Sequence, residues 1–289
     1  MNEIKGLTRR SALALGGAVA ITAATPLLRP ASAAGLMDQA MGDGLRVAFY
    51  NFKPYAFVDD SNTLVGTDIE LLRTVLEQMG GKIGEAQAVD WGALIPGVKT
   101  GRFDVVAAGM FVTPKRCAEV RFSQPYFGIK QALAVMKGNP KGIQNYDSVR
   151  DMGLMIGVIS GAAQFGYAQA AGIDEANIMQ LPDNPAGIAA LRAGRIDAWA
   201  VSAPGVREIV KGVPEGDIES SPVFASIGDT KAVSHGAFAF RPEDGDFVDA
   251  FNEVLVPFVG SAAHVAIMEK YDMSADELPV ERTENLCGG

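Results

Sequence analysis

Short apolar runs alternate with segments of helical period along the first part of the chain. Residues 45–49 are mostly apolar, which predicts a buried strand. In residues 68–79 the large apolar side chains recur every three or four positions, which predicts a helix that stops at Gly80-Gly81. We predict a second helix over residues 91–99 and a strand over 103–108. This alternation indicates an α/β fold with a largely parallel sheet.

The pattern is repeated later in the chain. Residues 98–104 and 191–197 both end a helix with glycine, continue through arginine, and open an apolar strand with aspartate. The strand predicted after the second copy covers residues 198–201, and a strand over 155–159 and a helix over 162–171 precede it. We therefore predict two lobes of similar construction.

Two further apolar strands, predicted over residues 132–137 and 236–241, are expected to connect the lobes. In that arrangement lobe 1 comprises residues 35–132 plus 233–289, and lobe 2 comprises residues 133–232. A cleft between two lobes is a favoured place for a small-molecule site.

Residues 1–34 have the layout of a cleaved export signal. Basic side chains precede position 11, residues 11–28 are uncharged, and Ala31-Ser32-Ala33 resembles a cleavage site. The pair Arg9-Arg10 favours the twin-arginine route over the general one. A membrane anchor is the alternative, but the glycines, threonines and proline of this stretch make it a poor span. We expect cleavage near Ala33 and a periplasmic protein with no lipid anchor.

Composition limits the class of protein. The chain has 289 residues, which favours two lobes or domains, and its 48% hydrophobic content is that of a globular protein. Its 25 basic and 34 acidic residues give a net charge of −9. Without residues 1–34 the chain carries 21 basic and 33 acidic residues, a net charge of −12. Such a surface repels nucleic acid, so nucleic-acid binding is excluded as the main function.

The sequence gives no reason to expect a metal or an organic cofactor. The two histidines, His235 and His264, lack metal-ligand spacing, and two cysteines cannot form a four-cysteine zinc site. Phosphate-loop, dinucleotide-binding and Gly-x-Ser-x-Gly motifs are absent from the sequence.

Aromatic residues and one arginine follow the predicted strands on loops rich in glycine and proline. Phe52, Tyr55, Trp91 and Phe111 are core residues in one interpretation and face a ligand in the other. Ligands of open α/β sheets bind beyond the carboxyl ends of the strands, which favours the second interpretation. Arg116 can grip a carboxylate with two N–H groups, and ring faces can hold a cation. Together they predict a site for a zwitterion.

The sequence resembles a known family. The motifs that carry the resemblance are Trp91-Gly92-Ala93-Leu94-Ile95-Pro96-Gly97, Gly101-Arg102-Phe103-Asp104, Thr113-Pro114-Lys115-Arg116 and Phe122-Ser123-Gln124-Pro125-Tyr126. They are similar to the solute-binding proteins of polar amino-acid ABC importers, known as family 3. Three further motifs resemble the ectoine/hydroxyectoine-binding subgroup: Gly109-Met110-Phe111, Lys115-Arg116-Cys117-Ala118 and Glu284-Asn285-Leu286-Cys287.

The resemblance implies a type II periplasmic-binding-protein fold, in which each of two lobes has a mostly parallel sheet flanked by helices and two hinge strands join the lobes. It also implies a monomeric, non-catalytic subunit that captures a small zwitterion for the transmembrane subunits of an ABC permease. The candidate ligand-binding residues are Phe52, Tyr55, Trp91, Gly109, Phe111, Arg116, Gly161, Ala163 and Ser202.

The resemblance assigns a role to several of these residues. Arg116 would bind the ligand carboxylate, and Tyr55, Trp91 and Phe111 would form an aromatic box around the ligand ring. The family's threonine after Gly161 is replaced by alanine, so that backbone N–H groups at a helix start would help the carboxylate.

Two positions depart from the family. Phe52 stands where ectoine binders place an acid, and Ser202 where amino-acid binders place an aspartate. Burying a primary ammonium without acceptors costs several kcal/mol, whereas a delocalised or alkylated cation needs fewer acceptors. Ectoine or hydroxyectoine is therefore expected, with a betaine-type solute or a polar amino acid as alternatives.

The sequence leaves two enzyme interpretations open. Cys117 could be a nucleophile, although in an exported protein a disulfide between Cys117 and Cys287 is favoured. A cyclohexadienyl dehydratase-like enzyme on the same fold would need an acid in the cleft, and the sequence places none there.

Overall fold

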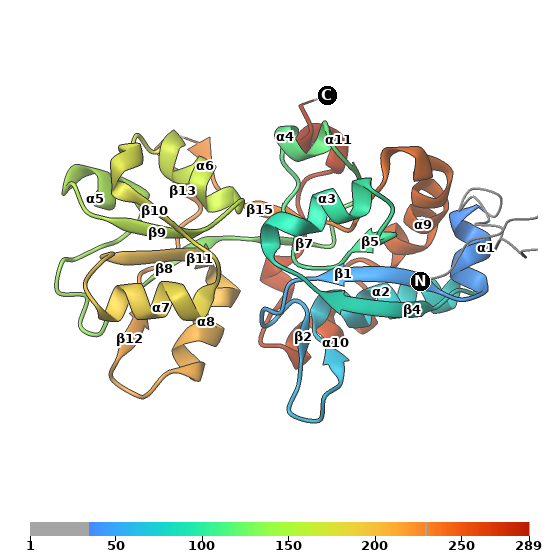
Figure 1. Cartoon of the computed structure of the whole chain (residues 1–289), viewed down its shortest axis with the longest axis horizontal. Coiled ribbons are helices and arrows are strands. Elements are labelled where there is room, and N and C mark those ends of the chain that lie inside the picture. The colour runs from blue at the N-terminus through green and yellow to red at the C-terminus, as the bar shows by residue number, and fades with distance from the viewer. Residues whose placement is uncertain (1–34, 229, 289) are drawn as a thin grey trace, which may run out of the picture. The chain divides into compact units, whose positions relative to one another are not determined.

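The computed structural model describes residues 35–228 and 230–288. The predicted export signal, residues 1–34, lies outside the described residues. Two five-stranded sheets organise the chain, each with its own helices (Figure 1). We call the sheet that contains β1 (Leu45–Phe49), with its helices, lobe 1, and the sheet that contains β9 (Ile156–Ile159), with its helices, lobe 2.

The sheet of lobe 1 has the strand order β4-β1-β5-β16-β6. β1 (Leu45–Phe49) is parallel to β4 (Ile83–Ala88) and to β5 (Val105–Val106). β16 (Ala239–Phe240) is antiparallel to both β5 and β6 (Arg121–Phe122). The strand predicted over residues 103–108 is therefore shorter than expected, while β1 has the predicted bounds.

The sheet of lobe 2 has the order β10-β9-β11-β8-β12 and repeats these orientations. β9 (Ile156–Ile159) is parallel to β10 (Ile178–Leu181) and to β11 (Ala198–Ser202). β8 (Gln131–Met136) is antiparallel to β11 and to β12 (Ile218–Ser220). The two lobes are thus built alike, as the repeated sequence pattern predicts.

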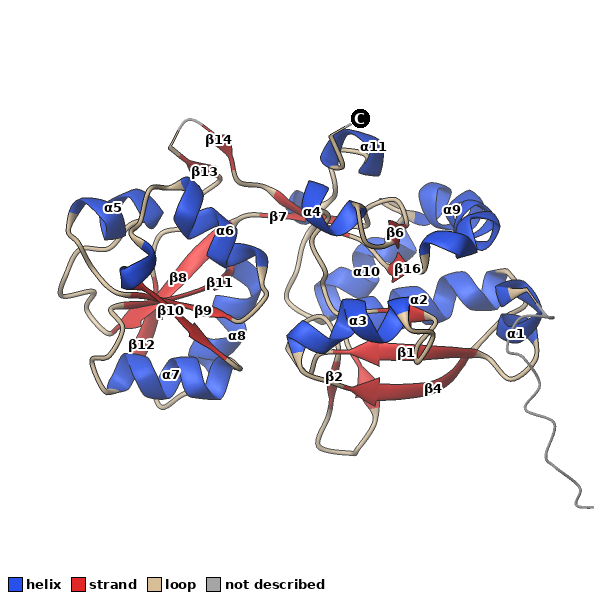
Figure 2. Cartoon of the chain, turned by 45° about the horizontal axis from the view of Figure 1, so that its top comes forward, coloured by secondary structure: helices blue, strands red, loops and turns tan. Residues whose placement is uncertain are grey.

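Helices pack on both faces of the sheet in lobe 2 (Figure 2). Side chains alternate along a strand, so neighbouring residues of β8 enter different clusters. Leu133 and Val135 pack in the cluster of α5 (Tyr146–Asp151) and α6 (Ala163–Ala170). Ala132 and Ala134 pack in the cluster of α7 (Asn184–Arg192) and α8 (Ala203–Gly212). The helices of lobe 2 are α5 (Tyr146–Asp151), α6 (Ala163–Ala170), η2 (Glu175–Asn177), α7 (Asn184–Arg192) and α8 (Ala203–Gly212).

The helices of lobe 1 come from both ends of the described chain. They are α1 (Leu36–Met41), α2 (Thr67–Gln78), η1 (Trp91–Ala93), α3 (Leu94–Lys99), α4 (Pro114–Cys117), η3 (Pro242–Asp244), α9 (Gly245–Phe258), α10 (Ala262–Lys270), η4 (Ala275–Glu277) and α11 (Thr283–Leu286). Within the described part of the chain, no single helix is long and apolar enough to cross a membrane. The segments 242–258 and 262–270 meet that test only jointly, as a pair bent by 88°.

Three two-stranded pairs complete the structure. β2 (Phe57–Val58) pairs with β3 (Leu64–Val65), and β13 (Ser226–Ile227) pairs with β14 (Thr230–Lys231). The third pair, β7 (Phe127–Ile129) with β15 (Ser234–Gly236), lies where the chain passes between the lobes.

The predicted connecting strands are therefore wrong. Residues 131–136 form β8 inside the sheet of lobe 2, and residues 239–240 form β16 inside the sheet of lobe 1. These segments are apolar because they are buried within the sheets. The connecting pair contains glycine, serine and histidine, so apolar content does not reveal it. The predicted lobe boundary after residue 132 falls within β8.

Candidate ligand-binding site

Both lobes line a small cavity of about 30 Å³, which we call the inner cavity. Its lining residues are Phe52, Tyr55, Trp91, Ala108, Gly109 and Phe111 from lobe 1, and Ile159, Ala162, Ala163, Gln164, Val201 and Ser202 from lobe 2. The other two predicted residues lie beside it: Arg116 donates a hydrogen bond to the carbonyl oxygen of Gly161, which directly precedes Ala162. The fold thus brings together all nine residues that the sequence singled out.

The sheet of lobe 1 determines where its lining residues lie. Phe52 and Tyr55 belong to the loop after β1, Trp91 opens η1 after β4, and Gly109 and Phe111 follow β5. β1, β4 and β5 are parallel, so their carboxyl ends meet at one edge of the sheet, which faces the cavity.

Tyr55 joins the two lobes across the cavity. Its hydroxyl lies 2.7 Å from the Ser202 hydroxyl oxygen, and burial raises the pKa of Tyr55 well above its usual range. The tyrosine therefore stays neutral.

A Cβ atom on Gly109 would lie 2.7 Å from the Tyr55 ring, and the φ of Gly109 is +62°. Glycine is required there for both reasons.

Arg116 is a buried cation without a carboxylate partner among the described residues. Its side chain donates to the carbonyl oxygens of Phe111, at 2.8 Å, and Gly161, at 3.2 Å, and it lies 5.5 Å from the centroid of the Trp91 ring. Only 6% of the residue is exposed. Burial lowers the pKa of Arg116 to about 10, so the group is still charged at neutral pH. A buried charge of this kind can be compensated by an anion entering the cavity.

Lobe 2 presents the start of α6 to the cavity. Ala162 precedes the helix and supplies no side-chain cap, so N–H groups of its first turn lack a side-chain acceptor. Gln164 also lines the cavity, and its Nε2 donates to Oε1 of Gln131 at 3.1 Å. Gln131 donates in turn to the Ser234 hydroxyl in the connecting strand β15, at 2.9 Å. Hydrogen bonds therefore lead from the cavity to the connection between the lobes.

The two positions that depart from the family carry no charge. The Phe52 ring packs on Gly205, where a Cβ atom would lie 2.5 Å from the ring. The Ser202 hydroxyl accepts from the backbone N–H of Gly205 at 3.3 Å and caps α8. None of the residues that line the inner cavity carries a carboxylate.

Sequence reasoning missed two polar residues at this site, Gln164 and Asp68. Asp68 is fully buried behind the cavity, where it accepts from the Gly109 N–H and the Tyr126 hydroxyl, both at 2.5 Å. Burial raises the pKa of Asp68 to about 6. In the sequence Asp68 resembles an ordinary acid in the first turn of a helix, and no local signal distinguishes it. For Gln164 the available signal was its position in the sequence, directly after Ala163 and three residues after Gly161.

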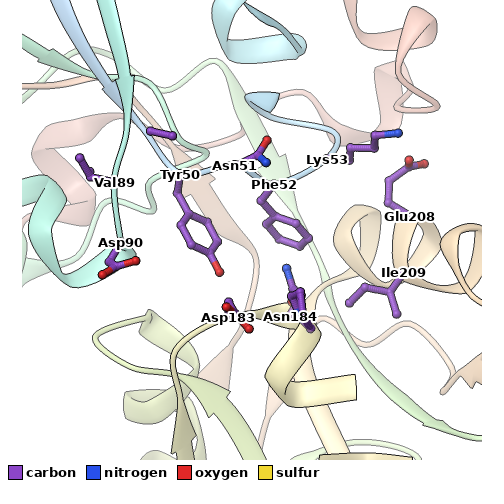
Figure 3. A pocket seen from close by; sticks show the side chains of 12 residues that line it. Tyr50, Asn51, Phe52, Lys53, Val89, Asp90, Asp183, Asn184, Glu208 and Ile209 are labelled. Atoms are coloured by element: carbon purple, nitrogen blue, oxygen red, sulfur yellow. The ribbon is translucent and has the colours of Figure 1, made fainter. Parts of the chain in front are cut away.

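A larger pocket of about 470 Å³ lies on the other side of Phe52, and we call it the outer pocket (Figure 3). Residues 50–53 and 88–90 of lobe 1 line it together with residues 183–185 and 208–209 of lobe 2. Burial and the nearby Asp183 raise the pKa of Tyr50 to about 12, so this tyrosine is neutral too.

The predicted disulfide is present. Cys117 and Cys287 are bonded, with Cα atoms 5.7 Å apart, so that α11 is tied to α4, the helix that carries Arg116. Because Cys117 is in the disulfide, it is not a free nucleophile in this structure. In the described part of the chain, no group of three or more His, Cys, Asp or Glu residues could hold a metal ion.

Comparison with known proteins agrees with this architecture. The family model for bacterial extracellular solute-binding proteins, family 3, matches residues 45–274. A probable amino-acid ABC transporter periplasmic-binding protein from Sinorhizobium fredii is 31% identical over 284 residues, which cover 95% of this chain and 94% of that protein.

Two solved structures are also similar. The complex of EhuB with hydroxyectoine is 29% identical, with a TM-score of 0.79, over 88% of this chain and 98% of that one. An ancestral amino acid-binding protein described as a precursor of cyclohexadienyl dehydratase is 25% identical, with a TM-score of 0.70, over 82% and 99% of the two chains.

Proposed function

This chain belongs to family 3 of the bacterial extracellular solute-binding proteins, the solute-binding subunits of amino-acid-type ABC importers, and we propose that its ligand is the compact zwitterion ectoine or hydroxyectoine. We further propose that residues 1–34 direct export, that cleavage occurs near Ala33, and that the monomer works in the periplasm.

The observation that carries the proposal is the buried Arg116 guanidinium, whose protein partners are carbonyl oxygens and an aromatic ring. A carboxylate can accept two N–H bonds from this group and balance its charge. The uncapped start of α6 and the amide of Gln164 offer further donors on the opposite lobe.

The ligand's cation would lie among the rings of Phe52, Tyr55, Trp91 and Phe111. Each ring contributes about 0.5–1 kcal/mol when exposed and about 2 kcal/mol when water is excluded. Since the lining offers no carboxylate, a delocalised or alkylated cation fits better than a primary ammonium. The similarity to EhuB, whose structure holds hydroxyectoine, supports the same ligand class.

A betaine-type solute is the second candidate, because its alkylated cation would be held by the same aromatic rings. A polar amino acid is the third, and the name of the Sinorhizobium relative supports it. An enzyme related to cyclohexadienyl dehydratase would need an acid beside its substrate, and the inner cavity offers none among its lining residues.

In the proposed mechanism the lobes close over the ligand by rotation about β7 and β15, and the permease reads the closed form. An unliganded lobe pair must open for entry, because an inner cavity of about 30 Å³ has room for little more than one water molecule.

A thermal-shift panel tests the ligand assignment. It contains ectoine, hydroxyectoine, glycine betaine, proline betaine and the twenty amino acids. A ligand at about 100 times its Kd stabilises by about 2.7 kcal/mol, a shift of roughly 5–10 °C for a chain of this size. A shift with ectoines alone supports the proposal, one with betaines or amino acids alone replaces the ligand, and no shift at all favours an enzyme.

A further inference from the structure

The outer pocket is separated from the inner cavity by the Phe52 ring, which lines both. That ring is held in place on α8, since it packs directly on Gly205. The two spaces therefore differ in chemistry: the inner cavity combines rings with a cation, Arg116, beside it, whereas the outer pocket combines rings with acids.

Three carboxylates and one ammonium group line the outer pocket. Asp183 caps α7 by accepting from the Ala186 N–H at 2.7 Å, and Glu208 pairs with Lys211 at 2.9 Å. Asp90 makes no hydrogen bond or ion pair with its side chain to residues that the structure describes. Lys53 lies 5.0 Å from the centroid of the Phe57 ring. Acidic groups are thus in excess in the pocket.

Asn184 gives a second and independent sign of a ligand. Only 9% of this residue is exposed, and its Oδ1 accepts from the indole Nε1 of Trp199 at 2.9 Å. An indole N–H can only donate, so the atom facing it must be the amide oxygen. The amide nitrogen is therefore turned toward Phe52 and the pocket (Figure 3), where it makes no hydrogen bond to the described residues. This donor belongs to a residue that is otherwise nine-tenths buried, it is open to the pocket, and an acceptor on a ligand can meet it.

These groups define what the pocket would hold. Its carboxylates attract N–H donors with positive charge, its Asn184 amide offers a donor to an acceptor, and the Tyr50 and Phe52 rings offer flat apolar faces. We propose that the outer pocket is a second ligand subsite, which takes a protonated amine or guanidinium compound that also carries a carbonyl or hydroxyl oxygen.

L-Argininamide is the probe of choice, because it has ammonium and guanidinium groups and a carbonyl oxygen but lacks the carboxylate that Arg116 would bind. Isothermal titration at low salt is expected to show binding to the wild-type protein and to Arg116→Ala alike. Tetramethylammonium, a cation without N–H donors, is expected to bind at least tenfold more weakly.

A triple variant tests the carboxylates. Asp90→Asn, Asp183→Asn and Glu208→Gln together should weaken L-argininamide at least tenfold, and asparagine at position 183 still caps α7. The matched control, Asp60→Asn, Glu77→Gln and Glu253→Gln, removes the same charge from exposed positions outside the pocket and should change affinity less than twofold.

Asn184→Asp tests the amide donor of Asn184. It keeps an oxygen toward Trp199 but replaces the free N–H group by an acceptor. The wild-type protein should prefer L-argininamide over agmatine, which lacks the carbonyl oxygen. Asn184→Asp should abolish that preference, even though its added negative charge strengthens the binding of both compounds. A general loss of folding would not change this ratio selectively.

Three results would overturn the subsite: no binding of L-argininamide by the wild-type protein, equal losses in the two triple variants, or loss of binding in Arg116→Ala. The subsite is independent of the ligand proposed for the inner cavity. A protein that binds L-argininamide but neither ectoines nor betaines keeps the subsite and loses the proposed function, and the converse result does the reverse.

Discussion

Arg116 of lobe 1 donates to the carbonyl oxygen of Gly161 in lobe 2 at 3.2 Å, and the same oxygen accepts from the indole Nε1 of Trp91 at 3.1 Å. One carbonyl group therefore holds the proposed carboxylate-binding side chain and one ring of the aromatic box at the start of α6. A carboxylate is a stronger partner for a guanidinium than a carbonyl oxygen, so an entering ligand would compete for the same donor.

Replacing Arg116 by alanine should weaken ectoine or glycine betaine, whichever the wild-type protein binds, by at least 100-fold. The loss follows because none of the residues that line the inner cavity is basic, so no lining side chain can replace the Arg116 guanidinium. Isothermal titration measures it, with the exposed Arg195→Ala as the control. Arg116→Lys should keep only part of the wild-type affinity, because lysine keeps the charge but cannot form the bidentate contact. Wild-type affinity in Arg116→Ala would show that Arg116 does not bind the ligand.

Phe111→Leu should weaken the binding of a cyclic or alkylated cation by about 2- to 30-fold, the range given by one cation–π contact of roughly 0.5–2 kcal/mol. Leucine keeps most of the apolar contact with the neighbouring Phe127 ring, 6.4 Å away, so the fold should persist. The matched control is Phe251→Leu, a core substitution that does not line the cavity. A change below twofold at position 111 would return Phe111 to a purely structural role.

Ser202→Asp should shift the ligand preference toward amino acids with a primary ammonium group, because a carboxylate at this position supplies the acceptor that such a group needs. Aspartate is also a good N-cap, so α8 should remain intact. The readout is the ratio of the Kd for ectoine to the Kd for glutamine, which should rise at least tenfold. An unchanged ratio would show that Ser202 does not face the ligand's cation.

Asp68 should make stability depend on pH. Its pKa in the folded protein is raised to about 6 from 3.8, so the folded state favours the protonated acid. The resulting stabilisation is complete below about pH 4 and is lost as pH rises to about 6, with an amplitude of about 3 kcal/mol at 1.36 kcal/mol per pKa unit.

Urea unfolding of wild-type and Asp68→Asn proteins at pH 4 and pH 7 measures this effect as a double difference. Asparagine keeps an acceptor for the Gly109 N–H and removes the titration. The variant should gain stability relative to the wild type on going from pH 4 to pH 7, whereas Asp60→Asn, an exposed control, should not. Identical pH profiles for Asp68→Asn and the wild type would contradict the assignment.

The sequence by itself determined what depends on short segments. The repeated motif ends in Asp104 in one lobe and Asp197 in the other, and the two share one pair of hydrogen bonds to a neighbouring backbone. The Asp104 N–H donates to the Arg46 carbonyl and its carboxylate accepts from the Arg46 N–H, and Asp197 does the same with Met155. The strand–helix order, the two lobes and the aromatic loops also follow from the sequence, because hydrophobic period and turn residues act locally.

Tertiary structure alone decided which strands connect the lobes and what lies behind and beside the site. β7 and β15 are joined only when residues far apart in sequence pair, and the more apolar β8 lies inside the sheet of lobe 2 instead. Asp68 meets Gly109 from 41 positions away, and the Asn184 amide is oriented by Trp199. The energies of these contacts depend on burial and on partners on other elements, and neither can be predicted from the linear order of the residues.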